Sequence, residues 1–216
     1  MGAPLPFIVG FLILLNCLIS FVGFNNEQFF NKFKFDIAYK GSQNSYRLVS
    51  AAFLHVSWSH LFFNMLTLYL FGYAVVQSLG DGRFLLLYFG SLLLGNLFAA
   101  FYHRKASHYA AVGASGGVSG IVFSTILLYP ALELYLFFIP IPIPGYLFAA
   151  AYVAYSLYGM KKQHDSIGHT AHLGGALSGI FLTLIFSPNL FLEAKQTLIY
   201  ITLTMLGVGL WLFRQR

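Results

Sequence analysis

The sequence predicts an all-α protein, a polytopic bundle of transmembrane helices. Hydrophobic residues make up 58% of the 216 residues, charged residues only 8%, and the mean hydropathy is +0.75. Soluble globular chains carry roughly a quarter charged residues. Several apolar runs approach 20 residues, and a helix of about that length crosses the ~30 Å hydrocarbon core of a bilayer. With no long polar segment for a soluble appendage, we expect residues 1–216 to form a single membrane domain.

Seven apolar runs predict seven spans, separated by short turns and one longer segment. Gly80, Asp81 and Gly82 predict a tight turn, and the alternating prolines of residues 140–144 predict extended chain before the fifth span. Residues 24–56 are expected to be the only sizeable loop, where phenylalanines and lysines suit a segment in the membrane interface or a solvated loop. The expected spans are 6–23, 57–78, 84–103, 115–129, 145–159, 170–187 and 196–213.

Spans two, four and six run in the same direction, and each carries polar residues near its N-terminal end. These residues are His60 and Asn64, then Ser115, then His172, so all should lie toward one membrane face. Ser115 and His172 stand fifteen and sixteen residues before the next proline. At 1.5 Å per residue this is about 22–24 Å, short of the full core, so both side chains should lie below the surface at matching depth.

Small residues on spans four and six predict that these two helices pack closely. Gly116 and Gly120 form one seam, and Gly175 and Gly179 form the other. Taken alone, such glycines indicate only a packing seam. Close packing of these two spans, however, would bring the Ser115 hydroxyl within reach of the His172 imidazole.

A serine and a histidine at this depth predict nucleophilic catalysis. A serine hydroxyl needs a neighbouring base, and a neutral imidazole is a competent one. The N-terminus of the helix at Ser115, with the side chains of His60 and Asn64 four residues apart on one face, could stabilise a developing oxyanion. We expect a dyad rather than a triad, because all acidic residues fall in loops or at span ends: Glu27, Asp36, Asp81, Glu133, Asp165 and Glu193.

Other chemistry has less support in the sequence. His169 and His172, with Asp165 nearby, could ligate a metal. Span six begins there, however, and no further strong ligand is spaced to complete the site, so we expect neither metal nor cofactor. Cys17 is the only cysteine, which excludes an intrachain disulfide. His55 is expected to support the site structurally, and no role is assigned to His103, His108 or His164. The net charge of +6 suits anionic lipid headgroups rather than nucleic acid.

Three motifs resemble those of the rhomboid intramembrane serine proteases, and the likeness runs from Tyr46 to about Pro188. The first consists of His55, His60 and Asn64, with four residues between the two histidines and three residues before the asparagine. The second is Gly-x-Ser-Gly over residues 113–116, and the third is Ala-His-x-x-Gly-x-x-x-Gly over residues 171–179. Their order on three co-directional spans makes the resemblance specific.

The resemblance implies that Ser115 is the nucleophile and His172 the general base. His60, Asn64 and the backbone of Ser115 would form the oxyanion hole, with Gly113 and Arg47 in structural positions. It also implies a six-helix core over about residues 6–187, to which the span 196–213 is an addition.

The implied activity is cleavage of transmembrane protein substrates, admitted laterally near span five within the membrane lipids, without a diffusible cofactor. The alternative is a non-catalytic rhomboid-like protein that binds membrane-protein clients. The oligomeric state is left open by the sequence.

Two positions depart from the family pattern. Tyr46 precedes Arg47 where the family usually has tryptophan, which keeps an amphipathic aromatic. Ser119 stands where the family often has an aromatic that stacks on the catalytic histidine. Another group would then have to hold the imidazole of His172.

The charge distribution and the resemblance predict opposite orientations. Positively charged loops are usually cytoplasmic, whereas the resemblance implies a cytoplasmic N-terminus and a site facing the extracytoplasmic side of a bacterial-type plasma membrane. We expect the orientation that the resemblance implies, with the site on the extracytoplasmic side. Ten of the twelve Lys and Arg residues fall on the face of the proposed site: Lys32, Lys34, Lys40, Arg47, Arg104, Lys105, Lys161, Lys162, Arg214 and Arg216.

Overall fold

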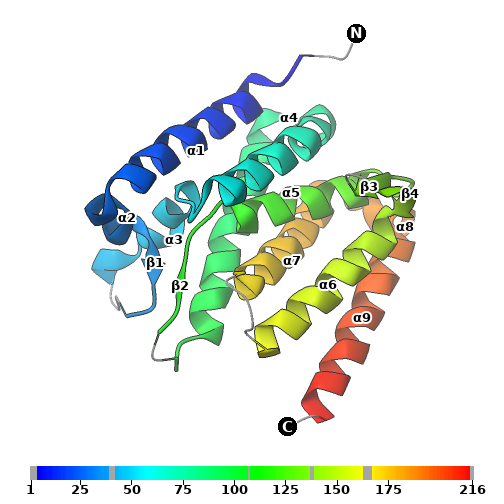
Figure 1. Ribbon diagram of the computed structural model, residues 1–216. Coiled ribbons are helices and arrows are strands. Elements are labelled where there is room, and N and C mark those ends of the chain that lie inside the picture. The colour runs from blue at the N-terminus through cyan, green and yellow to red at the C-terminus, as the bar shows by residue number, and fades with distance from the viewer. Residues whose placement is uncertain (1–3, 39–41, 107, 137–138, 163–166, 215–216) are drawn as a thin grey trace.

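The computed structural model describes residues 4–38, 42–106, 108–136, 139–162 and 167–214, and these form a helical bundle (Figure 1). Lys40, His164, Asp165 and Arg216 lie outside the described residues. The helices are α1 (Phe7–Asn25), α2 (Glu27–Phe33), α3 (Arg47–Ser50), α4 (Trp58–Tyr102), α5 (Ser115–Leu128), α6 (Gly145–Lys162), α7 (His169–Phe186), α8 (Leu190–Glu193) and α9 (Lys195–Arg214). Single 3-10 turns occur at Ser42–Asn44 and Ala51–Phe53.

The predicted class, an all-α polytopic bundle, is confirmed. Within the described ranges, α1, α4, α7 and α9 are long and apolar enough to cross a membrane. The 45 residues of α4 include all but one end residue of each of the predicted spans 57–78 and 84–103. The helix is broken at Gly80, where φ is +79°. The chain reverses at this glycine. The reversal is evident from the two arms of the helix, which pack so closely that a β-carbon on Gly72 would lie 3.5 Å from the ring of Phe84. The tight turn expected there is therefore present.

Helix α5 lies at the centre of the bundle, between α4, α6 and α7 (Figure 1). Twelve of its 14 residues are buried, and 14 residues extend only about 21 Å. The structure brings the two glycine seams together: a β-carbon on Gly175 would meet the carbonyl of Gly116, and one on Gly179 would meet the backbone of Gly120. This close approach sets α5 and α7 side by side.

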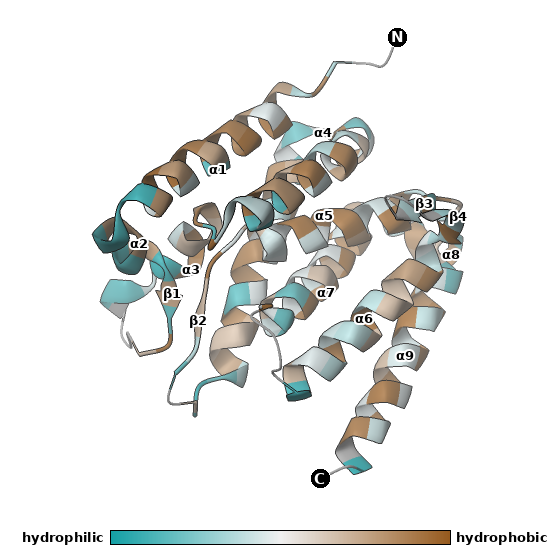
Figure 2. Cartoon of the chain, in the orientation of Figure 1, coloured by the Kyte–Doolittle hydropathy of each residue, from teal (hydrophilic) through white to brown (hydrophobic). Residues whose placement is uncertain are grey.

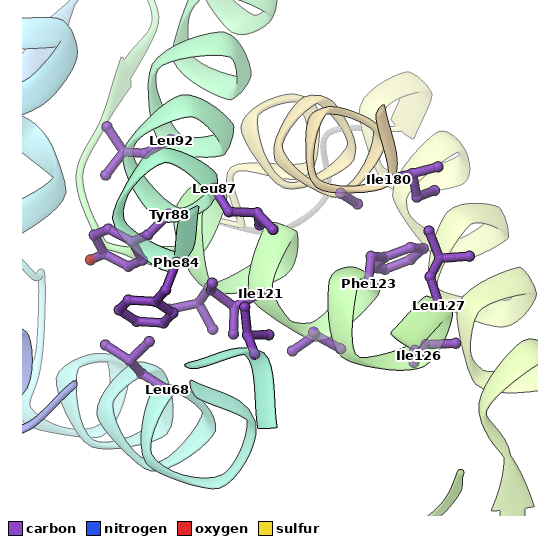
Figure 3. Close-up of a cluster of buried hydrophobic side chains, with 14 of the residues drawn as sticks. Leu68, Phe84, Leu87, Tyr88, Leu92, Ile121, Phe123, Ile126, Leu127 and Ile180 are labelled. Atoms are coloured by element: carbon purple, nitrogen blue, oxygen red, sulfur yellow. The ribbon is translucent and has the colours of Figure 1, made fainter. Parts of the chain in front are cut away.

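The core on the other side of α5 is filled with large apolar side chains. Figure 3 shows Leu68 and Phe84 from the two arms of α4 beside Ile121 of α5, all three fully buried. Inside a bilayer, the hydrophobic effect contributes little to the association of helices, because lipid tails are as apolar as the side chains. Close van der Waals packing is therefore the main attraction between them.

The segment 24–56, expected to be the only sizeable loop, contains several short helices and a strand. The helices include α2 and α3, and the strand β1 (Phe35–Asp36) pairs antiparallel with β2 (Ala110–Ala111). Arg47 is buried, and its Nη1 donates hydrogen bonds to the carbonyls of Asn31 (3.0 Å) and Lys34 (3.1 Å). By bonding these backbone carbonyls, the buried guanidinium holds α2 and the residues after it against α3. The composition of the segment does not predict these contacts.

Two further features agree with the sequence. The proline-rich residues 139–144 form the strand β4 (Ile139–Pro144), paired with β3 (Glu133–Leu136) ahead of α6. Several apolar side chains of α1 and α9 are exposed, and both helices carry many hydrophobic residues, drawn brown in Figure 2. The chain is an integral, multi-pass membrane protein.

Candidate active site

The structure brings Ser115 and His172 together. Ser115 is the first residue of α5, and His172 lies in the first turn of α7, whose N-cap is Gly168. The Nε2 atom of His172 lies 2.6 Å from the Ser115 hydroxyl oxygen. This is the geometry in which an imidazole can accept the proton of a serine hydroxyl.

The loop before Ser115 requires a glycine at position 113. Gly113 has φ of +121°, and a β-carbon there would lie 2.7 Å from Cε1 of His60. Its N–H donates to the carbonyl of Ala51 at 2.9 Å. The glycine therefore lets the chain pass directly over the His60 ring just before the candidate nucleophile.

The first turn of α5 offers backbone donors near the Ser115 hydroxyl. The first bond of the helix runs from the Val118 N–H to the Ala114 carbonyl, so the N–H groups of residues 115–117 precede it. Such groups, with the positive end of the helix dipole, favour a developing negative charge.

His60 and Asn64 differ in their positions relative to the cavity. His60 lines it, and within the described residues its Nδ1 has no hydrogen-bond partner. Asn64 is buried one turn further along and is not among the described residues that line the cavity. Its Nδ2 donates to the His60 carbonyl at 3.0 Å, which occupies one of its two amide hydrogens.

His55 holds the site from behind. Its Nδ1 lies 2.8 Å from the Ser20 hydroxyl of α1, and its Nε2 accepts the Ala114 N–H at 3.4 Å. The Ser20 hydroxyl in turn donates to the Phe53 carbonyl, which leaves the Nδ1–H of His55 as the donor to Ser20. Burial, followed by the nearby His60, lowers the pKa of His55 to about 3, so this histidine stays neutral.

A cavity of about 930 Å³ opens over Ser115 and His172. It extends from His60 along the segment 108–113 to the start of α7. Among the described residues that line it, none is acidic. No cluster of three metal-ligating side chains occurs in the described part of the chain, and the alternative site with Asp165 lies partly outside it.

Two residues near the dyad were not found by sequence reasoning. The ring of Tyr152, on α6, faces the imidazole of His172 with centroids 6.5 Å apart and planes at 21°. His103, directly after α4, hydrogen bonds the Thr170 hydroxyl at 2.9 Å and stacks on Tyr109 at 3.8 Å. Burial lowers the pKa of His103. No local pattern signals either residue, because their partners lie on other helices.

Comparison with known proteins gives a consistent result. The Rhomboid domain family matches residues 42–189. Rhomboid protein 1, mitochondrial, from Saccharomyces cerevisiae is 34% identical over 137 residues, covering 62% of this chain and 39% of the yeast protein. RHOMBOID-like protein 12, mitochondrial, from Arabidopsis thaliana is 30% identical over 168 residues, 71% of this chain and 50% of that protein. Rhomboid protease GluP from Bacillus subtilis is 30% identical over 181 residues, covering 80% of this chain and 34% of that protein.

The matches span only about a third to a half of the length of these relatives. Two of the three are mitochondrial and one is bacterial, so they do not support the expectation of a bacterial-type plasma membrane.

Proposed function

Because this chain belongs to the rhomboid family, we propose that it is an intramembrane serine endopeptidase that hydrolyses peptide bonds in or near transmembrane segments. The observation that carries the proposal is the 2.6 Å contact between His172 Nε2 and the Ser115 hydroxyl at the wall of a large cavity. GluP from Bacillus subtilis, whose match covers 80% of this chain, carries the name rhomboid protease.

In this mechanism, the Ser115 oxygen attacks the substrate carbonyl carbon as His172 Nε2 takes the hydroxyl proton. The carbonyl oxygen becomes an oxyanion beside the first N–H groups of α5. His60, which lines the cavity, and the second amide hydrogen of Asn64, one turn further along, would be its side-chain donors. One such donor typically contributes about 10²–10³ in rate. His172 then gives its proton to the leaving amine, and water hydrolyses the acyl-serine by the same route.

We also propose how the chain is organised around this chemistry. Residues 1–216 form one membrane domain in which α9 is added to a six-helix core. Among the described residues, a buried apolar cluster that reaches from Val9 to Ile201 supports this. Transmembrane substrates reach the cavity beside α6. The site faces the extracytoplasmic side of its membrane, although the sequence predicts that ten of the twelve basic residues lie toward that face.

The test is cleavage by purified protein in liposomes, with a panel of transmembrane segments that carry small residues near one helix end. Wild type should cleave at least one segment and react with a fluorophosphonate probe, whereas Ser115→Ala should do neither. Ser178→Ala is the matched control, because that hydroxyl bonds the Gly174 carbonyl of its own helix at 2.7 Å and no other partner among the described residues.

Equal cleavage by wild type and Ser115→Ala would refute the assignment of the nucleophile. Folded wild type that neither cleaves nor labels would favour the non-catalytic, client-binding alternative.

A further inference from the structure

The dyad raises the question of what fixes the ring plane of His172. The imidazole must keep Nε2 aimed at Ser115 while a substrate enters, and a small rotation would lengthen the 2.6 Å contact. Position 119 lies one turn after Ser115 on α5, and its serine side chain has no ring to pack on the imidazole.

The Tyr152 ring occupies that place from another helix. It lies 6.5 Å from the His172 ring at 21°, an offset-stacked arrangement within the range of favourable aromatic pairs. Its hydroxyl lies 2.6 Å from the buried Ser119 hydroxyl, and Phe123 packs edge-on against it at 5.3 Å. Tyr152 is therefore held by α5 at two points while its face lies toward His172.

We propose that Tyr152 is a positioning residue for His172, and that Ser119 fixes Tyr152 by hydrogen bonding its hydroxyl. The proposal rests on the function proposed above. In effect, the aromatic support of the base is supplied by α6, and α5 supplies the hydroxyl that anchors it.

This arrangement makes the orientation of His172 depend on the position of α6. Near its start, α6 packs Tyr146 against Tyr200 of α9 with ring centroids 4.9 Å apart. Near its end, Lys161 Nζ donates to the Leu212 carbonyl of α9 at 2.6 Å. Helices α6 and α9 lie side by side (Figure 1), so a displacement of this pair carries the Tyr152 ring away from His172.

The experiment compares Tyr152→Leu, Tyr152→Phe and the double variant Ser119→Tyr/Tyr152→Ala with wild type, on the segment that wild type cleaves. Tyr152→Leu should lower kcat about three- to tenfold with little change in KM, as expected from the loss of one aromatic pair. Tyr152→Phe keeps the ring but loses the hydroxyl that bonds Ser119, so its kcat should lie between those of wild type and Tyr152→Leu. The double variant returns a ring to α5 and should recover part of the lost kcat.

The control is Tyr158→Leu, which removes an exposed tyrosine from the same helix and should leave kcat unchanged. A readout that needs no activity is the NMR signal of the His172 ring, assigned with His172→Gln. It should shift in Tyr152→Leu, which removes the facing ring, and not in Tyr158→Leu.

Wild-type kcat in Tyr152→Leu, or an unchanged His172 signal, would overturn the inference and leave the proposed protease intact. Wild type that neither cleaves nor labels would overturn the proposed function, and the role of Tyr152 with it. Should the double variant fail to fold, the contrast between Tyr152→Leu and Tyr152→Phe still decides.

Discussion

At the scale of single residues, His55 connects three parts of the chain behind the candidate site. Its ring joins Ser20 of α1 to the Ala114 N–H directly before Ser115, and it packs edge-on against His60 at 4.9 Å. A buried polar ring with both nitrogens paired is costly to replace, because each lost partner leaves a group without a hydrogen bond. The neutral form is the one that fits, since Nε2 acts as an acceptor.

The low pKa of His55 predicts a pH dependence of stability. In the unfolded chain this histidine binds a proton below about pH 6.5, whereas in the folded protein its pKa is about 3. The contribution of His55 to the free energy of unfolding is therefore fully present above about pH 6.5. It decreases toward pH 3, by up to ~1.4 kcal/mol per pH unit. His55→Gln should lower the Tm near neutral pH and flatten its decline on acidification, measured by thermal unfolding in detergent.

The matched control is His108→Gln, because His108 is exposed beside the cavity. This variant should keep the wild-type decline. Burial lowers the pKa of His103 as well, so the informative quantity is the difference in slope between His55→Gln and wild type. Equal slopes would contradict the assignment.

At the scale of elements, the seam between α5 and α7 sets the distance between nucleophile and base. Both helices present glycines where their backbones meet, and Ser115 and His172 project from their first turns. In a membrane, little hydrophobic drive acts between helices, so this approach depends mainly on close van der Waals packing, together with the buried hydrogen bond from Thr183 of α7 to Ser124 of α5. A single added methyl group at the seam therefore has to push the backbones apart.

Gly175→Ala tests this dependence. Its β-carbon would meet the Gly116 carbonyl, and overpacking of this kind costs about 1–3 kcal/mol. The expected result is a lower Tm and slower fluorophosphonate labelling of Ser115, because the dyad contact lengthens. Gly207→Ala on α9 is the control, since a β-carbon there meets nothing within 4 Å. Unchanged Tm and labelling in Gly175→Ala would show that the seam is not needed.

At the scale of the whole molecule, the described basic residues are unevenly divided between the two ends of the bundle. Lys105 follows α4 on the face of the site, while Arg83 lies just after the Gly80 break at the other end. The positive-inside tendency would put the site toward the cytoplasm. The proposed orientation is the reverse.

Labelling with a membrane-impermeant maleimide decides the orientation when the protein is expressed in the plasma membrane of intact cells. In a Cys17→Ser background, Lys105→Cys should label from outside, and Arg83→Cys should label only after the membrane is permeabilised. Both positions are exposed in the structure, so access is limited by the membrane alone. The opposite pattern would place the site on the cytoplasmic side.

Much of the architecture follows from properties that lie along a single stretch of chain. Hydropathy over about 20 residues marks the spans, the Gly80 turn needs a glycine at positive φ, and the prolines of β4 exclude helix. The small residues of α5 and α7 also indicate by themselves which helices can approach closely. Because these signals are local, the sequence determined the fold class and which side chains lie toward the same end of the bundle.

What only the tertiary structure decided depends on how the helices are rotated and packed. The Ser119–Tyr152 bond joins residues 33 apart, and the His103–Thr170 bond joins residues 67 apart. The order of residues 24–56 depends in the same way on Arg47 reaching carbonyls 13 and 16 residues away. None of these pairs has a period or spacing in the sequence, because the partner of each group is set by the packing of another element against it.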